Sequence, residues 1–330
     1  MAETVSILIP VYNCRRWVAQ AIETALNQTW RACDVIVLDD GSVDGSLDVI
    51  NQFRNHIRIE SRTHSGQNRF RNLLTAGSSG DWLYFLDADD ELARNSVEEK
   101  MRVSSHVDAI YGSTEAVTYD TEGRSRSMMR VPAVDVDPWA AAFLWRLPNT
   151  SGFMFRRSAL LAAGGWDESI EVCTDYSLYF RLLLNGATFK PAPDSWSLYR
   201  HWSTDQAVHR NPLSRVNMRL QLMKQALDAL TLGGGLTMQR QLAFEQSTLH
   251  CIRALYGRDR PRARVEYREL MQRNQFVSPS RSEFRRLFVL AFRIGGYEFA
   301  ETLASWHRVA ARSLSWSWRE QAVDYDTIGG

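Results

Sequence analysis

Short apolar runs alternate with helical patterns over the first 90 residues, and this alternation limits the fold more than any other feature. The apolar runs lie at residues 5–10, 34–38, 57–61 and 82–86. Each run is short and nearly continuous, as expected for a strand that is buried on both faces of a parallel sheet. In the segments between them, apolar residues recur at helical spacing. The pattern predicts an α/β fold in which helices flank a doubly wound, mostly parallel sheet.

Two common nucleotide-binding versions of this fold do not match the sequence. The first apolar run continues into Val11-Tyr12-Asn13, a turn-like segment without the G-x-G-x-x-G of dinucleotide-binding proteins. The chain also lacks the G-x-x-x-x-G-K-[ST] motif of a phosphate-binding P-loop. A dinucleotide cofactor and a P-loop are therefore both disfavoured.

The fourth apolar run ends in a cluster of acids, Asp87-Ala88-Asp89-Asp90. Ligands of open α/β sheets bind at the carboxyl ends of the strands, so these acids lie at the expected ligand edge. Carboxylates this close repel one another unless a hard divalent cation lies between them. An N-cap of the following helix is the simpler explanation, but a cap does not require three acids. We therefore predict a site for a divalent metal and a diphosphate.

Polar residues earlier in the chain are candidates for the rest of such a site. Asp39 and Asp40 follow the second apolar run and could accept hydrogen bonds from a base or a ribose. The alternative is that the D-G-S segment they begin caps a helix. Arg69 and Arg71 lie in one predicted helix, and arginine binds phosphate oxygens in a two-pronged geometry. The alternative for these arginines is a solvated helix face.

Two candidates lie later in the chain. Asp175 follows Thr174 at the start of a predicted helix and could act as a general base. Alternatively, Thr174 is an N-cap and Asp175 a first-turn acid that the helix dipole favours. The imidazole of His201 could complete a metal shell, although a single histidine more often has a structural role.

Length and composition narrow the class of protein. A chain of 330 residues favours one large domain and an accessory region, which we place at residues 1–211 and 212–330. A formal net charge of +1 gives no drive toward nucleic acid. The four cysteines form no C-x-x-C pair, which argues against structural zinc and suits a reducing cytosol. We find no signal-peptide pattern and no apolar run of the ~18–20 residues that a spanning helix needs, so we expect a cytoplasmic protein.

Taken in order, several segments resemble the motifs of glycosyltransferase family 2, a large family of inverting enzymes with the GT-A fold. Four segments of the first 90 residues carry the resemblance: residues 7–13 look like the opening IPVYN, residues 38–46 match DDGSxDGS, residues 66–72 resemble GxxxARN, and residues 85–90 match LDxDD. Three later segments follow in the same order: residues 164–168 look like GGFDE, residues 174–176 stand at EDxxL, and residues 199–201 resemble a shortened YRxH. The chain departs from the family pattern at Phe70, where Ala is usual, and at Thr174, where Glu is usual. The resemblance covers residues 5–205 and does not extend beyond them.

This resemblance implies a nucleotide-sugar site in the first part of the chain. Tyr12 would stack on the base, Asp40 would bind the base or the ribose, and Arg71 would bind the base or a phosphate. The family motifs also place four further residues against the nucleotide sugar, with Asp87 at the ribose or the metal shell: Pro10, Asn13, Asp87 and Ala88.

The resemblance further implies a metal ligand and a general base. Asp89 would be the metal carboxylate, His201 would contact the metal or the diphosphate, and the oxygen-rich ligands favour Mg²⁺ or Mn²⁺. Asp175 would take the proton of an acceptor hydroxyl as it attacks the anomeric carbon. Because Thr174 replaces an acid, we expect a lower pKa for Asp175, other things being equal. On the acceptor side the motifs place Trp166 and Asp167.

The implied function is transfer of a sugar from a nucleotide sugar, with UDP favoured, to a hydroxyl of a glycan or of a polyprenyl-linked glycan. One alternative is a nucleotidyltransferase that makes such a donor. That class usually has a Gly-rich, Arg-containing loop after the first strand, and residues 11–14 do not form one. The other alternative is a protein that binds a sugar nucleotide without turning it over.

From Pro212 onward the pattern is helical and rich in arginine. Residues 285–318 combine basic side chains with aromatic ones such as Phe288, Trp306 and Trp316. A basic, Trp-bearing amphipathic helix can lie at an anionic membrane surface, which would make the protein peripheral to the inner face of the plasma membrane. The alternative is that these helices pack on the first domain or on a second subunit of a homodimer.

Overall fold

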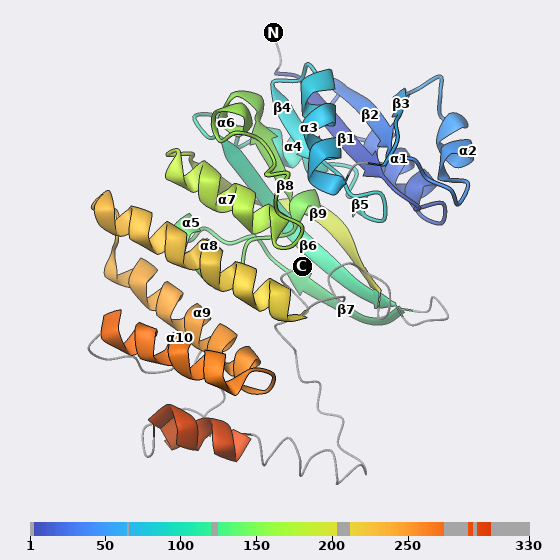
Figure 1. Cartoon of the computed structure of the whole chain (residues 1–330). Helices are drawn as coiled ribbons and strands as arrows, with labels where there is room; N and C mark the ends of the chain where they lie inside the picture. The colour runs from blue at the N-terminus through green and yellow to red at the C-terminus, as the bar shows by residue number, and fades with distance from the viewer. Residues whose placement is uncertain are drawn as a thin grey trace. The chain divides into compact units, whose positions relative to one another are not determined.

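The computed structural model of the protein describes residues 3–64, 66–119, 125–202, 212–273, 290–292 and 296–304. These residues form two compact units (Figure 1). The sheet unit comprises the described parts of residues 1–142 and 146–210, and the helical unit comprises Phe143–Trp145 and the described parts of residues 211–327. All residues that the sequence nominates for a site belong to the sheet unit.

The described strands of the sheet unit form one nine-stranded sheet with the order β3-β2-β1-β4-β8-β6-β9-β5, and β7 pairs with β6 at the side of this path. The strands are β1 (Val5–Val11), β2 (Cys33–Asp39), β3 (Arg58–Ser61), β4 (Trp82–Phe85), β5 (Glu91–Leu92), β6 (Ala109–Tyr119), β7 (Ser125–Val131), β8 (Phe153–Arg156) and β9 (Phe189–Trp202).

The half of the sheet built from β3, β2, β1 and β4 is parallel, as the sequence predicts. Val5 at the start of β1 pairs with Cys33 on one side and with Trp82 on the other, so these three strands start level. The residues that follow β1, β2 and β4 therefore meet at one edge of the sheet, which is where an open α/β fold binds its ligand.

The other half of the sheet is mixed. β8 runs antiparallel to both β4 and β6, whereas β9 runs parallel to β6. β9 is one strand of 14 residues, and its pairing with β6 shifts between Gly112 and Ser113. At this shift the Ser195 carbonyl oxygen lies 2.6 Å from where a Cβ on Gly112 would be, so only glycine allows the approach.

Helices separate the strands of the parallel half and continue through the sheet unit. They are α1 (Val18–Leu26), α2 (Ser46–Asn51), α3 (Gln67–Gly77), α4 (Ser96–Met101), α5 (Pro138–Phe143), η1 (Thr150–Gly152, a 3₁₀ turn), α6 (Arg157–Ala162) and α7 (Thr174–Leu184). α5 ends at Phe143, shortly before Trp145, whose left-handed backbone with φ of 57° does not continue the helix.

The core explains why the strands of the parallel half read as continuous apolar runs. Ile7 and Ile9 of β1 belong to one buried cluster with Val18 and Ile22 of α1. Leu8, which points to the opposite face of the sheet, is also fully buried. Because both faces of β1 are covered, alternation of apolar and polar residues is not required there.

The helical unit contains α8 (Pro212–Leu232), α9 (Met238–Tyr256) and α10 (Arg260–Arg273). Lys224 of α8 joins α10 through Glu266 at 2.7 Å and Glu269 at 2.6 Å. None of the helices in the described part of the chain combines the length and the apolar character needed to cross a bilayer. The basic, Trp-bearing stretch at residues 285–318, including Phe288, Trp306 and Trp316, lies largely outside the described residues.

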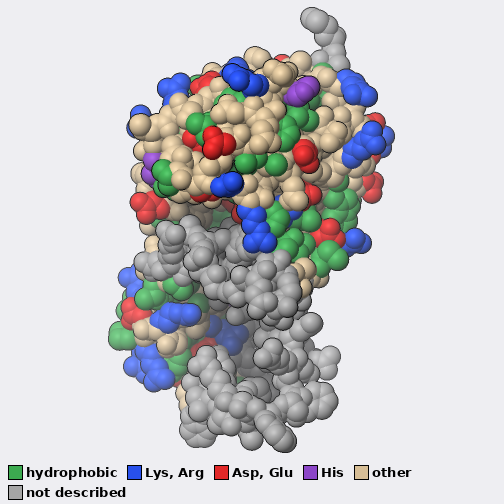
Figure 2. Space-filling view, turned by 90° about the vertical axis from the view of Figure 1, so that its right-hand side faces the viewer, with side chains coloured by type: hydrophobic (Ala, Val, Ile, Leu, Met, Phe, Trp, Pro, Cys, Tyr) green, Lys and Arg blue, Asp and Glu red, His purple; other side chains and the backbone are tan. Residues whose placement is uncertain are grey.

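The surface of the described residues carries no dominant charge of one sign on the face shown in Figure 2. Lys and Arg side chains are interspersed there with Asp and Glu. This distribution agrees with the formal net charge of +1.

Candidate active site

The acids after β4 (Asp87, Asp89 and Asp90) form a tight turn at the carboxyl edge of the sheet, here called the acid turn. The backbone N–H of Asp90 donates to the Asp87 carbonyl at 2.9 Å, and the N–H of Asp87 donates to Ser151 Oγ at 3.1 Å. Asp90 is fully buried and accepts hydrogen bonds from Asn149 Nδ2 and from the Arg200 backbone N–H, both at 3.1 Å. Asp90 therefore holds the turn, while the partly exposed Asp87 and Asp89 face the edge.

The three carboxylates disfavour one another's charge. Burial, and then the charge of Asp87, raise the pKa of Asp89 to about 6. Burial and the charges of Asp89 and Asp87 raise the pKa of Asp90 well above its usual range. A cation at this turn would reverse the repulsion and favour the ionised carboxylates.

Arg71 lies behind the acid turn and connects it to α7. This α3 side chain is 1% exposed and donates from Nη2 to Asp87 Oδ1 at 2.8 Å. Its Nη1 lies 3.9 Å from Asp175 Oδ1, and its guanidinium stacks over Trp166 at 4.4 Å. Within the described residues, Nε and Nη1 of Arg71 have no hydrogen-bond partner. A buried guanidinium with unused donors can bind an anionic oxygen strongly.

Trp166 and Asp167 belong to a loop that α3 fastens. Asn72 accepts from the Trp166 N–H and donates to the Trp166 carbonyl, each at 2.8 Å, while Asn68 donates to the Asp167 carbonyl at 2.7 Å. Trp166 is 2% exposed and lies beneath Arg71. Hydrogen bonds from Ser169 lower the pKa of Asp167 and tie its carboxylate to its own loop. The ring of Trp166 is therefore a buried support for the Arg71 guanidinium.

Asp175 occupies the first turn of α7 and is buried. The hydroxyl of Thr150, in η1, donates to Asp175 Oδ1. Burial raises the pKa of Asp175, and the charge of Asp87 adds to this, whereas Arg71 and the Thr150 hydrogen bond lower it. The sequence led us to expect a lower pKa from the loss of an acid at Thr174, but burial outweighs that difference.

The alternative of a capping threonine is also resolved by α7. Its N-cap is Cys173, which has φ of 58°, and no side chain makes a capping hydrogen bond there. Thr174 is thus already helical, and Asp175 is the acid of the first turn, where the helix dipole favours its ionised form.

A second group of residues lies at the ends of β1 and β2. Tyr12 is half exposed, and its ring stacks on that of His64 with 4.2 Å between centroids. Asp40 is buried, and its Oδ2 lies 2.8 Å from His64 Nδ1. Asn13 has φ of 50° and fixes the neighbouring loop through a 2.9 Å bond from the Val43 N–H. These residues bring one aromatic face and one carboxylate together.

Two acids of the DDGSxDGS segment, Asp39 and Asp44, are engaged by neighbouring backbone N–H and hydroxyl groups. Asp44 accepts from the backbone N–H groups of Arg15 and Ser46, both at 2.9 Å, and so secures the turn before α2. Asp39 accepts from Ser42 N–H and from the Ser61 hydroxyl, both at 3.2 Å. Asp40 is left as the acid that faces Tyr12 and His64. Pro10 lies near the end of β1, and Ala88 lies between Asp87 and Asp89. Neither has a polar side chain, so each would offer a ligand its backbone.

His201 was nominated as a metal neighbour, and its side chain lies outside the described residues. Its backbone is the penultimate position of β9 and pairs with Thr118. The preceding Arg200 was not nominated. It donates from Nη1 to the Asp89 carbonyl at 2.6 Å and pairs with Glu91, so it anchors the acid turn. Its place as the arginine of the YRxH-like segment, residues 199–201, was the sequence signal for this role.

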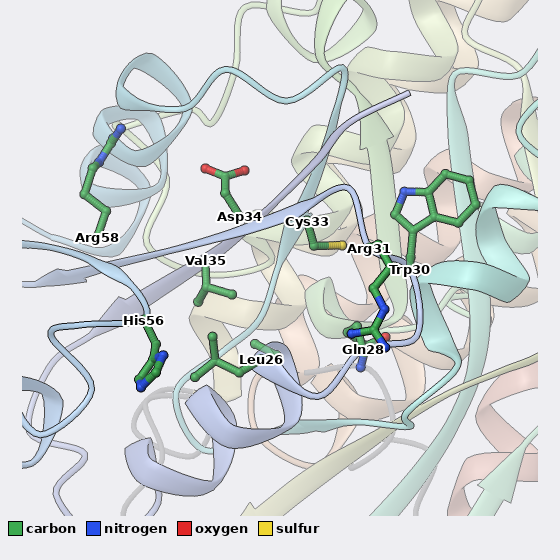
Figure 3. A pocket seen from close by; sticks show the side chains of 10 residues that line it. Leu26, Gln28, Trp30, Arg31, Cys33, Asp34, Val35, His56 and Arg58 are labelled. Carbon is green, nitrogen blue, oxygen red and sulfur yellow. The ribbon is translucent and has the colours of Figure 1, made fainter. Parts of the chain in front are cut away.

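The hollow in Figure 3 is a different feature from this site. It has a volume of about 310 Å³, and its lining includes Cys33, Asp34 and Val35, the first residues of β2. β2 reaches the site at its opposite end, through Asp39 and Asp40. The hollow therefore opens at the amino edge of the parallel strands, away from the acid turn.

Comparison with known proteins identifies the class. Solved glycosyltransferases with the GT-A fold share the fold of this chain. The chain aligns with S. aureus TarS residues 1–349 at a TM-score of 0.55 and 15% identity, covering 93% of this chain and 92% of that one. It aligns with the mannosyltransferase PcManGT of Pyrobaculum calidifontis at a TM-score of 0.53 and 14% identity, covering 94% and 81%.

The family follows from the sequence. Residues 6–162 match the profile of glycosyl transferase family 2, and this part of the chain is a domain of that family. Relatives include the chondroitin synthase of Escherichia coli, 29% identical over 185 residues that are 54% of this chain and 26% of that protein. The minor teichoic acid biosynthesis protein GgaA of Bacillus subtilis is 28% identical over 212 residues, which are 59% of this chain and 46% of that protein. The chain spans between 18% and 52% of the length of the curated relatives that it matches.

Proposed function

We propose that the protein is an inverting, metal-dependent glycosyltransferase. It transfers a sugar from a nucleotide-diphosphate sugar, with UDP as the nucleotide, to a hydroxyl of a glycan or lipid-linked glycan. The observation that carries this proposal is the position of Arg71, whose guanidinium lies between Asp87 of the acid turn and Asp175 of α7. One buried cation thus connects the carboxylates proposed for the donor with the carboxylate proposed as the base.

The residues present fit a divalent metal at the acid turn. No three His, Cys, Asp or Glu side chains of the described residues converge as a complete ligand set. Mg²⁺ and Mn²⁺ do not need one, because they are commonly held by one or two carboxylates together with substrate phosphates. Asp89 would be the protein ligand, supported by Asp87, and a bound cation would offset the burial and the Asp87 charge that raise the pKa of Asp89.

The remaining steps are derived from the side chains of this chain. Tyr12 and Asp40 bind the base, Tyr12 by stacking and Asp40 by accepting an N–H. A bound divalent cation would stabilise the charge that grows on the departing diphosphate. The free donors of Arg71 are placed to bind an anionic oxygen of the donor as well. Together these contacts hold the anomeric carbon in place.

Asp175 is the proposed general base. Its raised pKa makes the carboxylate a better proton acceptor than an ordinary aspartate, while Arg71 and Thr150 keep it ionised. It takes the proton of the acceptor hydroxyl as the hydroxyl oxygen attacks the anomeric carbon. The new bond forms on the face opposite the leaving diphosphate, so the configuration inverts.

Solved proteins of the same fold support the choice of donor and metal. TarS is known in complexes with UDP-GlcNAc and with UDP, and PcManGT in a complex with GDP-Man and Mn²⁺. Relatives that build chondroitin, hyaluronan and teichoic acid support a glycan acceptor. A nucleotidyltransferase is disfavoured because residues 11–14 form no Gly-rich, Arg-containing loop.

A donor turnover assay separates the proposal from a non-catalytic binding protein. UDP-sugars with Mn²⁺ should yield UDP, and EDTA should stop the release. Asp175→Asn should lower kcat by about 10²–10⁴-fold and leave the Kd for UDP unchanged, because only proton transfer is removed. Metal-dependent UDP binding without any turnover of a panel of UDP-, GDP- and TDP-sugars would refute the enzyme assignment.

The residues after 211 are proposed to serve the acceptor side, through contact with the acceptor, a membrane surface or a second subunit. A peripheral membrane location follows if the acceptor is polyprenyl-linked, and the basic stretch at residues 285–318 supports it. Flotation with anionic liposomes at low salt tests this part separately. Protein that stays entirely in the unbound fraction would rule out the membrane surface.

A further inference from the structure

We propose that His64 occupies the nucleobase position of the donor-free protein and must leave it when a nucleotide binds. This inference rests on the proposed function, which assigns base binding to Tyr12 and Asp40. It adds a residue that limits donor affinity, because His64 competes with the base for the same two contacts.

The contacts of the imidazole carry the inference. The ring of His64 is nearly parallel to that of Tyr12, with 25° between the planes and 4.2 Å between the centroids. Its Nδ1 lies 2.8 Å from Asp40 Oδ2, so the ring donates an N–H to a buried carboxylate. A flat ring therefore stacks on the tyrosine and points a donor at the aspartate.

A uracil ring in this position would make the same two contacts. Its face would stack on Tyr12, and its ring N–H would donate to Asp40. Only one ring can stack at contact distance on the same face of Tyr12, and His64 stacks there. His64 also contacts Asp40 Oδ2, the oxygen proposed to accept the uracil N–H. The two rings therefore exclude one another.

The backbone places His64 there without any need for the base. Gly41, directly after Asp40, has φ of +71°. A Cβ on this glycine would lie 3.1 Å from the His64 backbone N and 3.2 Å from the Arg62 carbonyl oxygen. The segment after β3 thus packs closely on the turn after β2, and the Arg62 N–H donates to the Asp39 carbonyl at 3.0 Å. This packing brings the imidazole over Asp40.

The imidazole is also able to leave. Its side chain is 53% exposed, so withdrawal from Tyr12 does not open the core. Tyr12 is 49% exposed and would be covered again by the base. His64 thus lowers donor affinity by a moderate factor and leaves the site competent.

The competition is specific to the base, which defines the experiment. Isothermal titration calorimetry of the full-length protein with Mn²⁺ would compare UDP with pyrophosphate, which has no base. His64→Ala should bind UDP about tenfold more tightly, the size expected for removing one ring stack and one hydrogen bond to Asp40. The same variant should bind pyrophosphate as the wild type does. Arg62→Ala, in the same segment and pointing to Glu60, is the matched control and should leave both affinities unchanged.

A spectroscopic readout tests displacement directly. In the wild type, the imidazole carbon-bound protons of His64 should lose the ring-current shift of Tyr12 as UDP is added, and pyrophosphate should not produce this change. An unchanged or weaker affinity of His64→Ala for UDP would overturn the inference, since it would mean that His64 is neutral or helps to hold the base.

Failure of the proposed function gives a different pattern. Because His64 uses the same two contacts in the wild type, the base assignment is tested in the His64→Ala background. If adding Tyr12→Ala or Asp40→Asn there does not weaken UDP binding, the base is not bound there, and both the base assignment and the inference fail. If these two variants do weaken UDP binding while His64→Ala does not strengthen it, the base assignment stands and only the role of His64 is rejected.

Discussion

Arg71 and Asp175 approach one another within the buried interior of the site, with 3.9 Å between Nη1 and Oδ1. The distance is too long for a hydrogen bond but short enough for the guanidinium to stabilise the carboxylate charge. Arg71 makes its hydrogen bond with Asp87 instead, at 2.8 Å. The state of the proposed base is therefore coupled to the acid turn through one side chain.

Replacement of Arg71 should move the acidic limb of the pH–rate profile. The guanidinium lowers the pKa of Asp175, so Arg71→Ala should raise that pKa. The base is active when ionised, and activity would then begin at higher pH. We expect an upward shift of about one pH unit in the acidic limb of kcat, together with a loss of about 10²-fold in kcat/KM.

Arg69→Ala is the control for this experiment, because Arg69 is exposed on the same helix α3. It should change neither the limb nor kcat/KM by more than about twofold, as is usual for surface substitutions. If the acidic limb of Arg71→Ala stays where it is in the wild type, Arg71 does not set the pKa of Asp175, and any loss of rate comes from weaker substrate binding.

The crowded carboxylate of Asp89 should make metal-free protein less stable as the pH rises through the acid range. Its pKa is about 6 in the folded protein and 3.8 without the fold, so the folded state binds more protons between these values. Stability therefore falls as the pH rises from about 4 to 6. Asp89→Asn removes this penalty and should stabilise the metal-free protein by about 2 kcal/mol at pH 7, measured by urea unfolding.

Asp167→Asn provides a control of opposite sign. Hydrogen bonds from Ser169 lower the pKa of Asp167, so its ionised form contributes stability above the unfolded pKa and loses it as the pH falls. Its replacement should destabilise the protein at pH 7. Equal responses of the two variants would contradict the charge crowding at the acid turn. With Mn²⁺ and UDP present, the advantage of Asp89→Asn should disappear, because only the wild type gains from the metal.

Lys100 should destabilise the protein at and below neutral pH. This α4 residue is fully buried, and its hydrogen-bond partners are the hydroxyls of Tyr84, Ser96 and Ser195. Burial lowers its pKa to about 7 from 10.5. Between these values the unfolded chain binds the extra proton, so stability should rise with pH from about 7 to 10. Lys100→Met should raise the melting temperature at pH 6.5 and flatten its rise toward pH 9.

The replacement leaves the neighbouring hydroxyls paired. Tyr84 bonds to Ser96 at 2.9 Å, and Ser96 bonds to Ser195 at 2.8 Å, so no buried donor loses its last partner. Arg102→Met is the control, because it removes an exposed cation directly after α4 and should leave the pH dependence of the melting temperature unchanged. If Lys100→Met melts at a lower temperature than the wild type at pH 6.5, the buried charge of Lys100 does not destabilise the protein.

The parallel half of the sheet and its acid turn could be predicted because their signals are local. Continuous apolar runs report burial on both faces, and the acids follow their strand directly. The antiparallel insertion of β8 between β4 and β6 could not be predicted in this way. It depends on pairing between segments about 70 residues apart, such as Leu83 with Phe155, and no local pattern encodes that partner.

The residues that sequence reasoning missed act through long-range contacts. Thr150 donates to Asp175, and Arg200 supports Asp89, but each is distant in sequence from the residue it serves. His64 was not a candidate, because its position at Asp40 depends on the turn at Gly41, which lies in another segment of the chain. Trp166, by contrast, was a candidate because of its motif. The structure places its ring beneath Arg71, where it supports the guanidinium.

The loop that carries Trp166 offers a test of that supporting position. Gly165 has φ of +66°, and a Cβ there would lie 2.8 Å from Asn72 Oδ1, the atom that accepts the Trp166 N–H. Gly165→Ala should therefore combine left-handed strain with displacement of Asn72. Loss of the hydrogen bond would loosen Trp166 beneath Arg71, so UDP binding should weaken several-fold while Asp175 itself is untouched.

Gly186→Ala isolates the strain from the displacement. Gly186 has φ of +80°, and a Cβ there would meet nothing within 4 Å. It should lose about 1 kcal/mol from the left-handed backbone alone and bind UDP like the wild type. Gly165→Ala should lose more stability than Gly186→Ala, because its Cβ also clashes with Asn72 Oδ1. Adding Asn72→Ala to Gly165→Ala removes this clash and should recover part of the additional loss. If the two glycine variants bind UDP equally well, the Trp166 loop does not position Arg71.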